Sequence, residues 1–124
     1  MAFQIIYYRT ETGRQPVKEW IDELAAATDA ESARRSDKID YYLRLLATDG
    51  VTIGKPAVDH LDGEIYELRP LRDRVLFAAW TGGKFVLLHH FRKATQKTPR
   101  REIEIAKQRL KNFRARQSQG DDNG

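Results

Sequence analysis

Two apolar segments joined by a pair of glycines constrain the fold of this chain more than any other feature. They run from 74 to 81 and from 85 to 91, and Gly82-Gly83 between them has the composition of a two-residue hairpin turn. Most positions of both segments are apolar, whereas a strand with one face in water alternates apolar and polar residues. The pattern therefore predicts two antiparallel strands in the middle of a sheet, with other elements covering both faces.

The first part of the chain predicts one strand followed by two helices. Residues 3–8 are rich in β-branched and aromatic side chains, which is typical of a strand. Apolar residues then recur at helical spacing over 15–27 and again over 30–49. Thr28 or Asp29 can cap the second of these helices. The two segments together predict an αα-hairpin.

Short strands lie between this helical hairpin and the apolar strands. After a loop over 51–56, the Asp62-Gly63 turn separates an expected strand at 58–61 from another at 65–69. Both are short, and Pro70 ends the second because proline cannot donate to a sheet ladder.

One more helix completes the expected fold. Thr98 and Pro99 predict its N-cap and first residue, and it has one apolar stripe, formed by Ile103, Ala106, Leu110 and Phe113. Residues 117–124 are polar and acidic, so we expect a disordered tail there. The order β-α-α-β-β-β-β-α over residues 1–116 predicts a single α+β domain. Its small, mainly antiparallel twisted sheet is flanked by an N-terminal αα-hairpin and a C-terminal helix.

Composition excludes several classes of protein. The chain of 124 residues has no cysteine, which excludes disulfides, thiolate metal sites and cysteine nucleophiles. No apolar run approaches the roughly 20 residues that span a bilayer. The N-terminal residues lack the basic start and the small-residue cleavage site of a signal peptide. We therefore expect a cytoplasmic protein without a membrane segment.

Positive charge is concentrated late in the chain. Residues 84–116 carry 11 basic side chains against two acids, Glu102 and Glu104, whereas residues 1–83 carry 11 basic and 14 acidic side chains. The basic residues of the last helix include Arg100, Arg101, Lys107, Arg109, Lys111 and Arg114. One interpretation is a stripe that faces the phosphates of a nucleic acid, and the other is an ordinary solvated helix face.

The common catalytic motifs are missing from the sequence. It contains no Walker loop, no G-x-G-x-x-G after a strand, no H-E-x-x-H and no G-x-S-x-G elbow. His89 and His90 are adjacent in an expected strand, so their side chains point to opposite faces and do not chelate one metal ion. We therefore expect neither a metal nor a cofactor.

Cations gather around the ends of the expected strands. Arg69 ends one strand and Arg74 begins the next, Lys93 follows the last strand, and Lys97 precedes the last helix. Neighbouring strands lie about 4.8 Å apart, so side chains from three strands can converge on one phosphate. The alternative is ordinary ion pairing of these arginines with Glu64, Glu67 or Asp73.

This arrangement suits cleavage of RNA by its own 2′-hydroxyl. The reaction needs a base for the hydroxyl proton, an acid for the 5′-oxygen, and fixed positive charge on the transition state. Arginine suits the last role because its planar fork matches a phosphate. A histidine, His89 or His90, could act as base or acid, and a lysine with a depressed pKa could act as acid. A core role for one of the two histidines is the alternative.

Residues 65–113 resemble the HigB-like, phage-related branch of the RelE/ParE toxin superfamily. The resemblance rests on Tyr66-Glu67-Leu68-Arg69, on Arg74, and on the run from Leu87 to Pro99, LLHHFRKATQKTP. The N-terminal strand and paired helices also fit the layout of that superfamily. The resemblance implies a small sheet flanked by helices, and a type II toxin that cuts mRNA in the ribosomal A site without a metal.

The resemblance also implies a partner and a set of site residues. The partner would be a helix-turn-helix antitoxin. The superfamily's phosphate-binding arginines fall on Arg69 and Arg74, and its late catalytic cation falls on Lys93. We add His89 and His90 as candidates for proton transfer. Further nucleic-acid contacts are expected from Lys97, Arg92, Arg100 and Arg101.

The sequence departs from this branch at two positions, which leaves other functions open. Members often have glycine where this chain has His90, and a second lysine where it has Ala94, so the general base is undetermined. A non-enzymatic inhibitor of DNA gyrase, as in the ParE branch, is one alternative function. A nucleic-acid-binding module without toxicity is another.

Overall fold

The fold is built on a five-stranded mixed sheet, seen in a computed structural model that describes residues 2–118. In spatial order the strands are β1 (Gln4–Tyr7), β5 (Lys84–Arg92), β4 (Asp73–Trp80), β3 (Ile65–Leu68) and β2 (Val58–Asp62). β1 runs parallel to β5, and every other neighbouring pair is antiparallel. The short strand expected before the Asp62-Gly63 turn is therefore present as β2.

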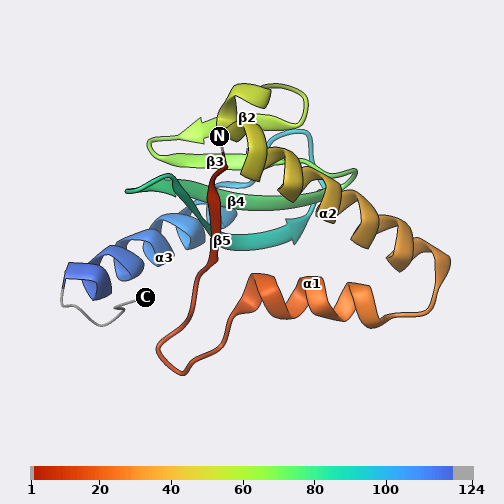
Figure 1. Cartoon of the computed structure of the whole chain (residues 1–124), viewed down its shortest axis with the longest axis horizontal. Helices are drawn as coiled ribbons and strands as arrows, with labels where there is room; N and C mark the ends of the chain where they lie inside the picture. Colours follow the sequence, from red (N-terminus) through yellow and green to blue (C-terminus); the bar gives the residue numbers. More distant parts are fainter. Residues whose placement is uncertain (1, 119–124) are drawn as a thin grey trace.

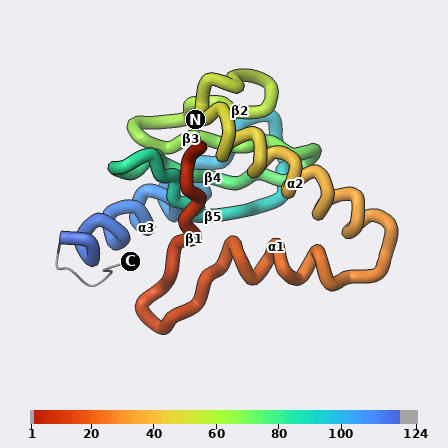
Figure 2. Tube along the Cα trace, in the orientation of Figure 1, coloured from red at the N-terminus to blue at the C-terminus, as the bar shows by residue number. Residues whose placement is uncertain are grey.

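Helices cover both faces of the sheet, as the apolar character of β4 and β5 predicts (Figure 1). α1 (Pro16–Ala26) and α2 (Ala30–Asp49) form a hairpin on one face, and α3 (Arg100–Ser118) crosses the other. The continuous trace in Figure 2 shows how the chain passes from the helical hairpin into the sheet and ends in α3. The α+β class and the order of the elements are confirmed.

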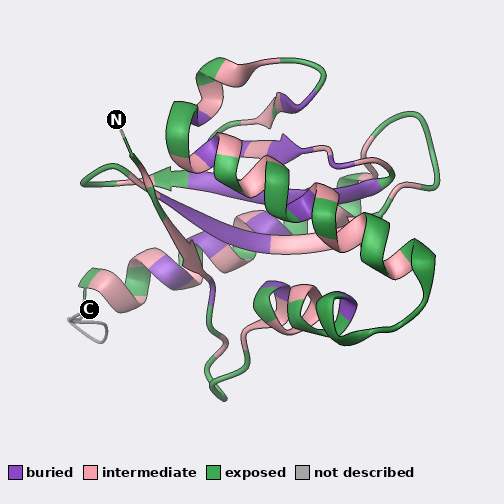
Figure 3. Ribbon diagram, turned by 45° about the vertical axis from the view of Figure 1, so that its right-hand side comes forward, coloured by how far each residue is buried: buried purple, intermediate pink, exposed green. Residues whose placement is uncertain are grey.

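Residues of the two central strands alternate between two cores. Val75 and Phe77 of β4 face the core under α1 and α2, whereas Leu76 and Ala78 face the core under α3. All four side chains are fully buried, and the central strands carry most of the buried colour in Figure 3. Because both faces are buried, neither strand needs the polar alternation of an exposed sheet.

One irregularity decides which way the histidines of β5 point. The register between β4 and β5 shifts after the Leu76–His89 pair, so that Phe77 lies opposite Leu87 and Leu88 is the extra residue. Such a bulge advances the alternation of side chains by one position. As a result His89 follows Leu88 onto the α3 face, and His90 lies on the α1 face.

Two turns differ from the sequence prediction. The β4–β5 connection has three residues, 81–83, rather than two, because Trp80 pairs with Lys84. Gly82 and Gly83 both have positive φ, which glycine adopts without strain, so their requirement is confirmed although the turn is longer. The loop expected at 51–56 begins instead with a 3₁₀ turn, η1 (Gly50–Ile53).

The ends of the helices also refine the prediction. Asp29 caps α2 by accepting a hydrogen bond from the Ser32 backbone N–H at 2.9 Å. Thr98 is not the cap of α3, because the helix begins at Arg100 and the Thr98 hydroxyl donates to another residue. α3 continues through Ser118, so the first two residues of the expected tail are helical, and residues 119–124 lie outside the described residues. None of the helices within residues 2–118 combines the length and the apolar character needed to cross a membrane.

Candidate functional site

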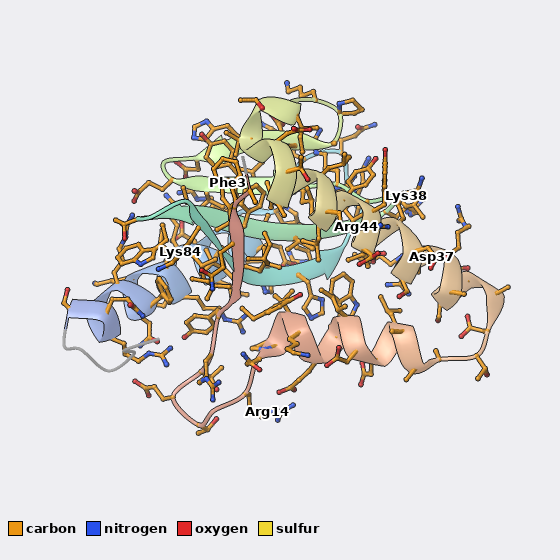
Figure 4. The ribbon with its side chains drawn as sticks, viewed as in Figure 1. Phe3, Arg14, Asp37, Lys38, Arg44 and Lys84 are labelled. Carbon is orange, nitrogen blue, oxygen red and sulfur yellow. The ribbon has the colours of Figure 1, made fainter. Side chains whose placement is uncertain are left out.

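A polar hollow of about 170 Å³ opens where β3, β4 and β5 meet the segment that leads into α3. It lies at the carboxyl end of β5, and the labelled Lys84 in Figure 4 marks the opposite end of that strand. Four of the predicted site residues line it, namely Arg69, Arg74, Lys93 and Lys97. The structure thus brings together four cations, from the residue after β3, from β4 and from the segment after β5, that are up to 28 residues apart in the sequence.

Arg74 is the most constrained of these cations. Its side chain is buried, and its Nη1 donates to the carbonyls of Leu71 at 2.9 Å and Asp73 at 2.8 Å. No carboxylate within residues 2–118 forms an ion pair with it. Burial lowers the pKa of Arg74 from its ordinary value, but an arginine remains charged near neutral pH. The hollow therefore holds a fixed positive charge that two backbone carbonyls orient and that no carboxylate contacts directly, while Glu67 and Asp73 act on it at longer range.

The turn before β4 sets the position of Arg74. Pro70 O accepts a hydrogen bond from the Asp73 N–H at 3.1 Å, and Leu71 lies in the left-handed region with φ 62°. This conformation costs a residue with a side chain about 1–2 kcal/mol. Strained backbone of this kind is found preferentially at functional sites. Here it directs the Leu71 carbonyl at the Arg74 guanidinium.

Asp73 is turned away from the hollow. Arg35 of α2 binds both of its carboxylate oxygens, with Nε–Oδ2 at 3.0 Å and Nη2–Oδ1 at 2.7 Å. Asp73 is almost fully buried. This bidentate pair anchors the turn to α2, and the acid nearest to Arg74 in sequence already has a partner of its own.

Glu67 is the functional residue that sequence reasoning missed. It is fully buried at the edge of the hollow, where its Oε1 accepts from Arg69 Nε at 2.9 Å and its Oε2 accepts from the Thr98 hydroxyl at 2.5 Å. It thereby ties β3 to the segment before α3. Strand alternation places Glu67 on the same face as Ile65, so an acid at an inward position was the available signal.

Arg69 differs from Arg74 in having acidic partners. Besides Glu67, its Nη2 donates to Asp59 Oδ2 at 3.0 Å. The alternative of ordinary ion pairing, considered for both arginines, therefore describes Arg69. Its charge is largely compensated within the fold, whereas that of Arg74 is not.

Lys93 and Lys97 lie on the segment that closes the hollow. The Lys93 N–H donates to Arg72 O at 2.8 Å, and Lys97 O accepts from the Thr95 hydroxyl at 2.6 Å. Their backbone is thus fixed, while neither ammonium forms an ion pair with a carboxylate of the described chain. Lys97 is exposed and Lys93 half-buried, so both can reach an anion in the hollow.

The structure does not bring the two histidines into the hollow. His89 lies farther along the same face and its Nε2 is 2.6 Å from Glu102 Oε1, while burial lowers its pKa more than Glu102 raises it. His90 lies on the other face and stacks on Trp20, with ring centroids 4.2 Å apart. Burial, reinforced by the charges of His89 and Arg109, lowers the pKa of His90 to about 4. Proton transfer by His90 at this site would require a different fold.

Most other predicted nucleic-acid contacts have partners elsewhere in the molecule. Arg92 pairs with Glu31 at 3.0 Å on the α2 side. Arg100 pairs with Asp62 at 2.7 Å and with Glu104 at 2.9 Å. Arg101 is exposed and lies 3.7 Å from Glu102. Of the four residues expected to contact nucleic acid, the hollow contains only Lys97.

The remaining basic residues of α3 follow the same pattern. Lys107 shares Asp62 at 2.8 Å, and Arg114 pairs with Glu64 at 2.5 Å. Arg109 donates to the Leu88 carbonyl at 2.8 Å. The basic stripe of α3 is thus used mainly to attach the helix to the sheet.

Residues 2–118 contain no group of three or more His, Asp or Glu side chains arranged to hold a metal ion. The mixed sheet, the helical hairpin before it, the helix after it and the cationic hollow belong to a chain whose family is toxin-like. Residues 19–111 match the family model of Phage derived protein Gp49-like (DUF891), and the chain belongs to this family. The matched range includes every residue of the hollow. No curated protein matches the chain.

Proposed function

We propose that this protein is the toxin of a type II toxin–antitoxin pair, and that it cleaves mRNA on the ribosome in the manner of the HigB-like branch. The observation that carries the proposal is the hollow itself. Arg74, Lys93 and Lys97 line it, and none of them has a carboxylate partner within residues 2–118. Unpaired cations held at fixed positions around one concave site suit a phosphodiester.

The proposed chemistry is transfer of the scissile phosphate to the 2′-hydroxyl of the same nucleotide. The 2′-oxygen forms a bond to phosphorus and the bond from phosphorus to the 5′-oxygen breaks, which leaves a 2′,3′-cyclic phosphate and a 5′-hydroxyl. The proton lost from the 2′-hydroxyl is balanced by the proton gained at the 5′-oxygen. Negative charge grows on the phosphate oxygens in the transition state, where fixed donors are most effective.

Each residue of the hollow has a proposed part in this reaction. Arg74 binds the phosphate oxygens through the nitrogens that are not bonded to Leu71 and Asp73. Lys93 neutralises or protonates the leaving 5′-oxygen, and Lys97 binds the strand beside it. Arg69 contributes a weaker charge, since Glu67 and Asp59 already pair with it.

The group that accepts the 2′-hydroxyl proton is not one of the cations. His89 is the nearest histidine on this face, because its ring contacts Phe91, which lines the hollow, at a centroid distance of 5.9 Å. Its Nε2 is engaged with Glu102, so Nδ1 is the nitrogen that remains to accept the proton. Water in the hollow is the other acceptor available to the reaction.

A helix-turn-helix antitoxin is the proposed partner, and the cytoplasm is the proposed compartment. The physical basis for the partner is the same unpaired charge. An acidic or amphipathic segment can cover the hollow and compete with RNA for Arg74 and Lys97.

The test is a primer-extension map of cellular mRNA after brief induction of the wild type and of Arg74→Ala. We expect cleavages within translated codons that require active translation, and a loss of at least a hundredfold in the variant, as when one fixed donor to a transition-state anion is removed. A circular dichroism spectrum and a thermal unfolding curve like those of the wild type show that the variant is folded.

Other outcomes separate the alternatives. Intact transcripts in growth-arrested cells with DNA-damage signalling would favour an inhibitor of DNA gyrase. Intact transcripts in growing cells would favour a nucleic-acid-binding module without toxicity. Full cleavage by Arg74→Ala would remove Arg74 from the site.

A further inference from the structure

A second hollow adjoins the first and is not used by the reaction above. It has a volume of about 340 Å³ and is lined by the turn before β4 and by the segment after β5. Arg74, Lys93, Ala94, Thr95 and Gln96 line both hollows. The two hollows are therefore neighbours that share one wall, and Arg74 and Lys93 are the cations of that wall.

Arg72 is the cation that the second hollow adds. Its side chain is exposed, and its Nη2 is 3.4 Å from the Lys93 carbonyl, which is a long and weak hydrogen bond. Within the described chain it forms no ion pair with a carboxylate. The planar fork of Arg72 is thus held beside the shared wall with most of its donors available.

The second hollow, unlike the first, has no acidic side chain in its lining. None of the side chains that line it is Asp or Glu, and the acid next to Arg72 in sequence, Asp73, is buried and bonded to Arg35. In the first hollow Glu67 compensates Arg69. The second hollow is therefore positive without internal compensation, which favours an anionic ligand over a neutral one.

We propose that the two hollows bind two successive phosphates of one RNA strand, with the scissile phosphate in the first hollow and a flanking phosphate on Arg72 in the second. This inference rests on the proposed function and gives its substrate class: an oligonucleotide with at least two adjacent phosphodiesters, rather than a mononucleotide or a dinucleotide. Arg72 is then a binding residue of the second subsite. Arg74 and Lys93 contact both phosphates or the linkage between them.

The experiment measures binding of two short ligands that cannot be cleaved. A 2′-O-methyl dinucleotide carries one phosphodiester and a 2′-O-methyl trinucleotide carries two, and both have free terminal hydroxyls. Dissociation constants come from NMR titration of the full chain, followed at the Nε–Hε signals of Arg72 and Arg74. The same spectra show that each variant is folded.

For the wild type we expect the trinucleotide to bind about tenfold more tightly than the dinucleotide. The slope of log affinity against log salt should be steeper for the trinucleotide by about 0.7, the value for one more phosphate of a single strand. Arg72→Ala should remove both differences while it leaves the dinucleotide affinity unchanged. Arg72→Lys should restore part of the salt dependence, because a lysine keeps the charge but not the fork.

Lys111→Ala is the matched control, since Lys111 is an exposed cation of α3 outside both hollows. It should keep both differences. Equal affinity of the wild type for the two ligands, or a persistent tenfold difference in Arg72→Ala, would overturn the second subsite and leave the proposed cleavage standing. If the wild type binds neither ligand but binds a peptide of six aspartates at Arg72, both the subsite and the proposed function fall, and the hollows belong to an acidic protein partner.

Discussion

Two basic regions of the molecule are both rich in arginine and lysine but differ in how far acids pair with these residues. One is the stripe along α3, and the other is the rim of the paired hollows, formed by Arg72, Arg74, Lys93 and Lys97. On α3, Arg100 and Lys107 share Asp62, and Arg114 pairs with Glu64. On the rim, Arg74 forms no such ion pair within residues 2–118, and the two acids near it are bonded to other residues, Asp73 to Arg35 and Glu67 to Arg69 and Thr98. The stripe attaches α3 to the sheet, whereas the cations of the rim remain available to an anionic ligand.

The difference shows that the function of a cation depends on which acid the fold places opposite it. The charge count along the chain assigns the excess to residues 84–116 and gives α3 the larger share. The fold then brings Asp62, the last residue of β2, and Glu64, in the turn that follows, against that helix. On the rim of the paired hollows, by contrast, Arg72, Arg74, Lys93 and Lys97 form no ion pair with a carboxylate of residues 2–118.

The largest expected effect comes from removing two cations of one region at a time. Lys93→Ala with Lys97→Ala should reduce mRNA cleavage on the order of a hundredfold, because both charges face the phosphate. It should also lower the salt slope of binding to single-stranded RNA by about 1.4, which is about 0.7 for each lost contact. Cleavage is measured by primer extension in a translation reaction.

The matched pair on α3 is Arg100→Ala with Arg114→Ala. This variant loses the same amount of positive charge as the Lys93 and Lys97 double variant. If the location of the charge decides the effect, cleavage should stay within about twofold of the wild type. The loss of stability should be small, because the side chains of these ion pairs are largely exposed. A hundredfold loss of cleavage in this pair would mean that α3 binds RNA after all.

A smaller effect should follow from abolishing the difference between the regions. Asp62→Asn with Glu64→Gln removes the acids of Lys107 and Arg114 and leaves Arg100 with Glu104 alone, so α3 should become a second phosphate-binding face. Binding to single-stranded RNA should then show a salt slope steeper by about 1–2. Cleavage at the rim should stay unchanged, and a binding isotherm at several salt concentrations decides the matter.

The smallest expected effect is a difference in pH dependence between the histidines and the cations of the rim. His90 has a folded pKa of about 4, below its unfolded value of about 6.5. The unfolded state therefore takes up a proton first. The free energy of unfolding should be at its full value above pH 6.5 and decrease as the pH falls toward about 4. The rim consists of arginine and lysine, so its affinity for the trinucleotide should not change between pH 7.5 and 6.

Urea unfolding at pH 7 and pH 5 measures this dependence, with His90→Phe as the control that keeps a ring against Trp20 but cannot titrate. The control should lose a substantial part of the dependence between pH 7 and pH 5, and His89, whose pKa is also lowered, should account for some of the rest. An unchanged dependence in His90→Phe would mean that His90 is not its source.

Local patterns predict much of this fold and part of the site. Apolar periodicity locates the strands and helices to within a few residues, because each element buries one face or both and the pattern of burial repeats along the sequence. The same reasoning brings Arg69, Arg74, Lys93 and Lys97 together, since they stand at the ends of adjacent strands. Local patterns thus predict correctly those features that depend on neighbouring residues in the chain or on neighbouring strands in the sheet.

What local patterns miss depends on contacts between distant residues. Thr98 is a residue type that often caps helices, but its hydroxyl donates to the carboxylate of Glu67, 31 residues earlier in the chain. The partners of Arg100 and Lys107 are 38 and 45 residues away. The bulge at Leu88 places His90 on the face that carries Trp20, and no local sequence pattern marks this bulge. Such choices are made by the assembled sheet, and a single sequence does not show them.

The pairing of β1 with β5 has a consequence for the order in which the protein takes shape during synthesis. Gln4 lies opposite Lys84, so the first strand has no place in a sheet until about 80 more residues have been added. Contacts of such sequence separation form late, whereas the α1–α2 hairpin and the β4–β5 hairpin use neighbouring residues. During synthesis β1 therefore stays unpaired until β5 has been made, whereas each hairpin can form as soon as its own two elements are complete.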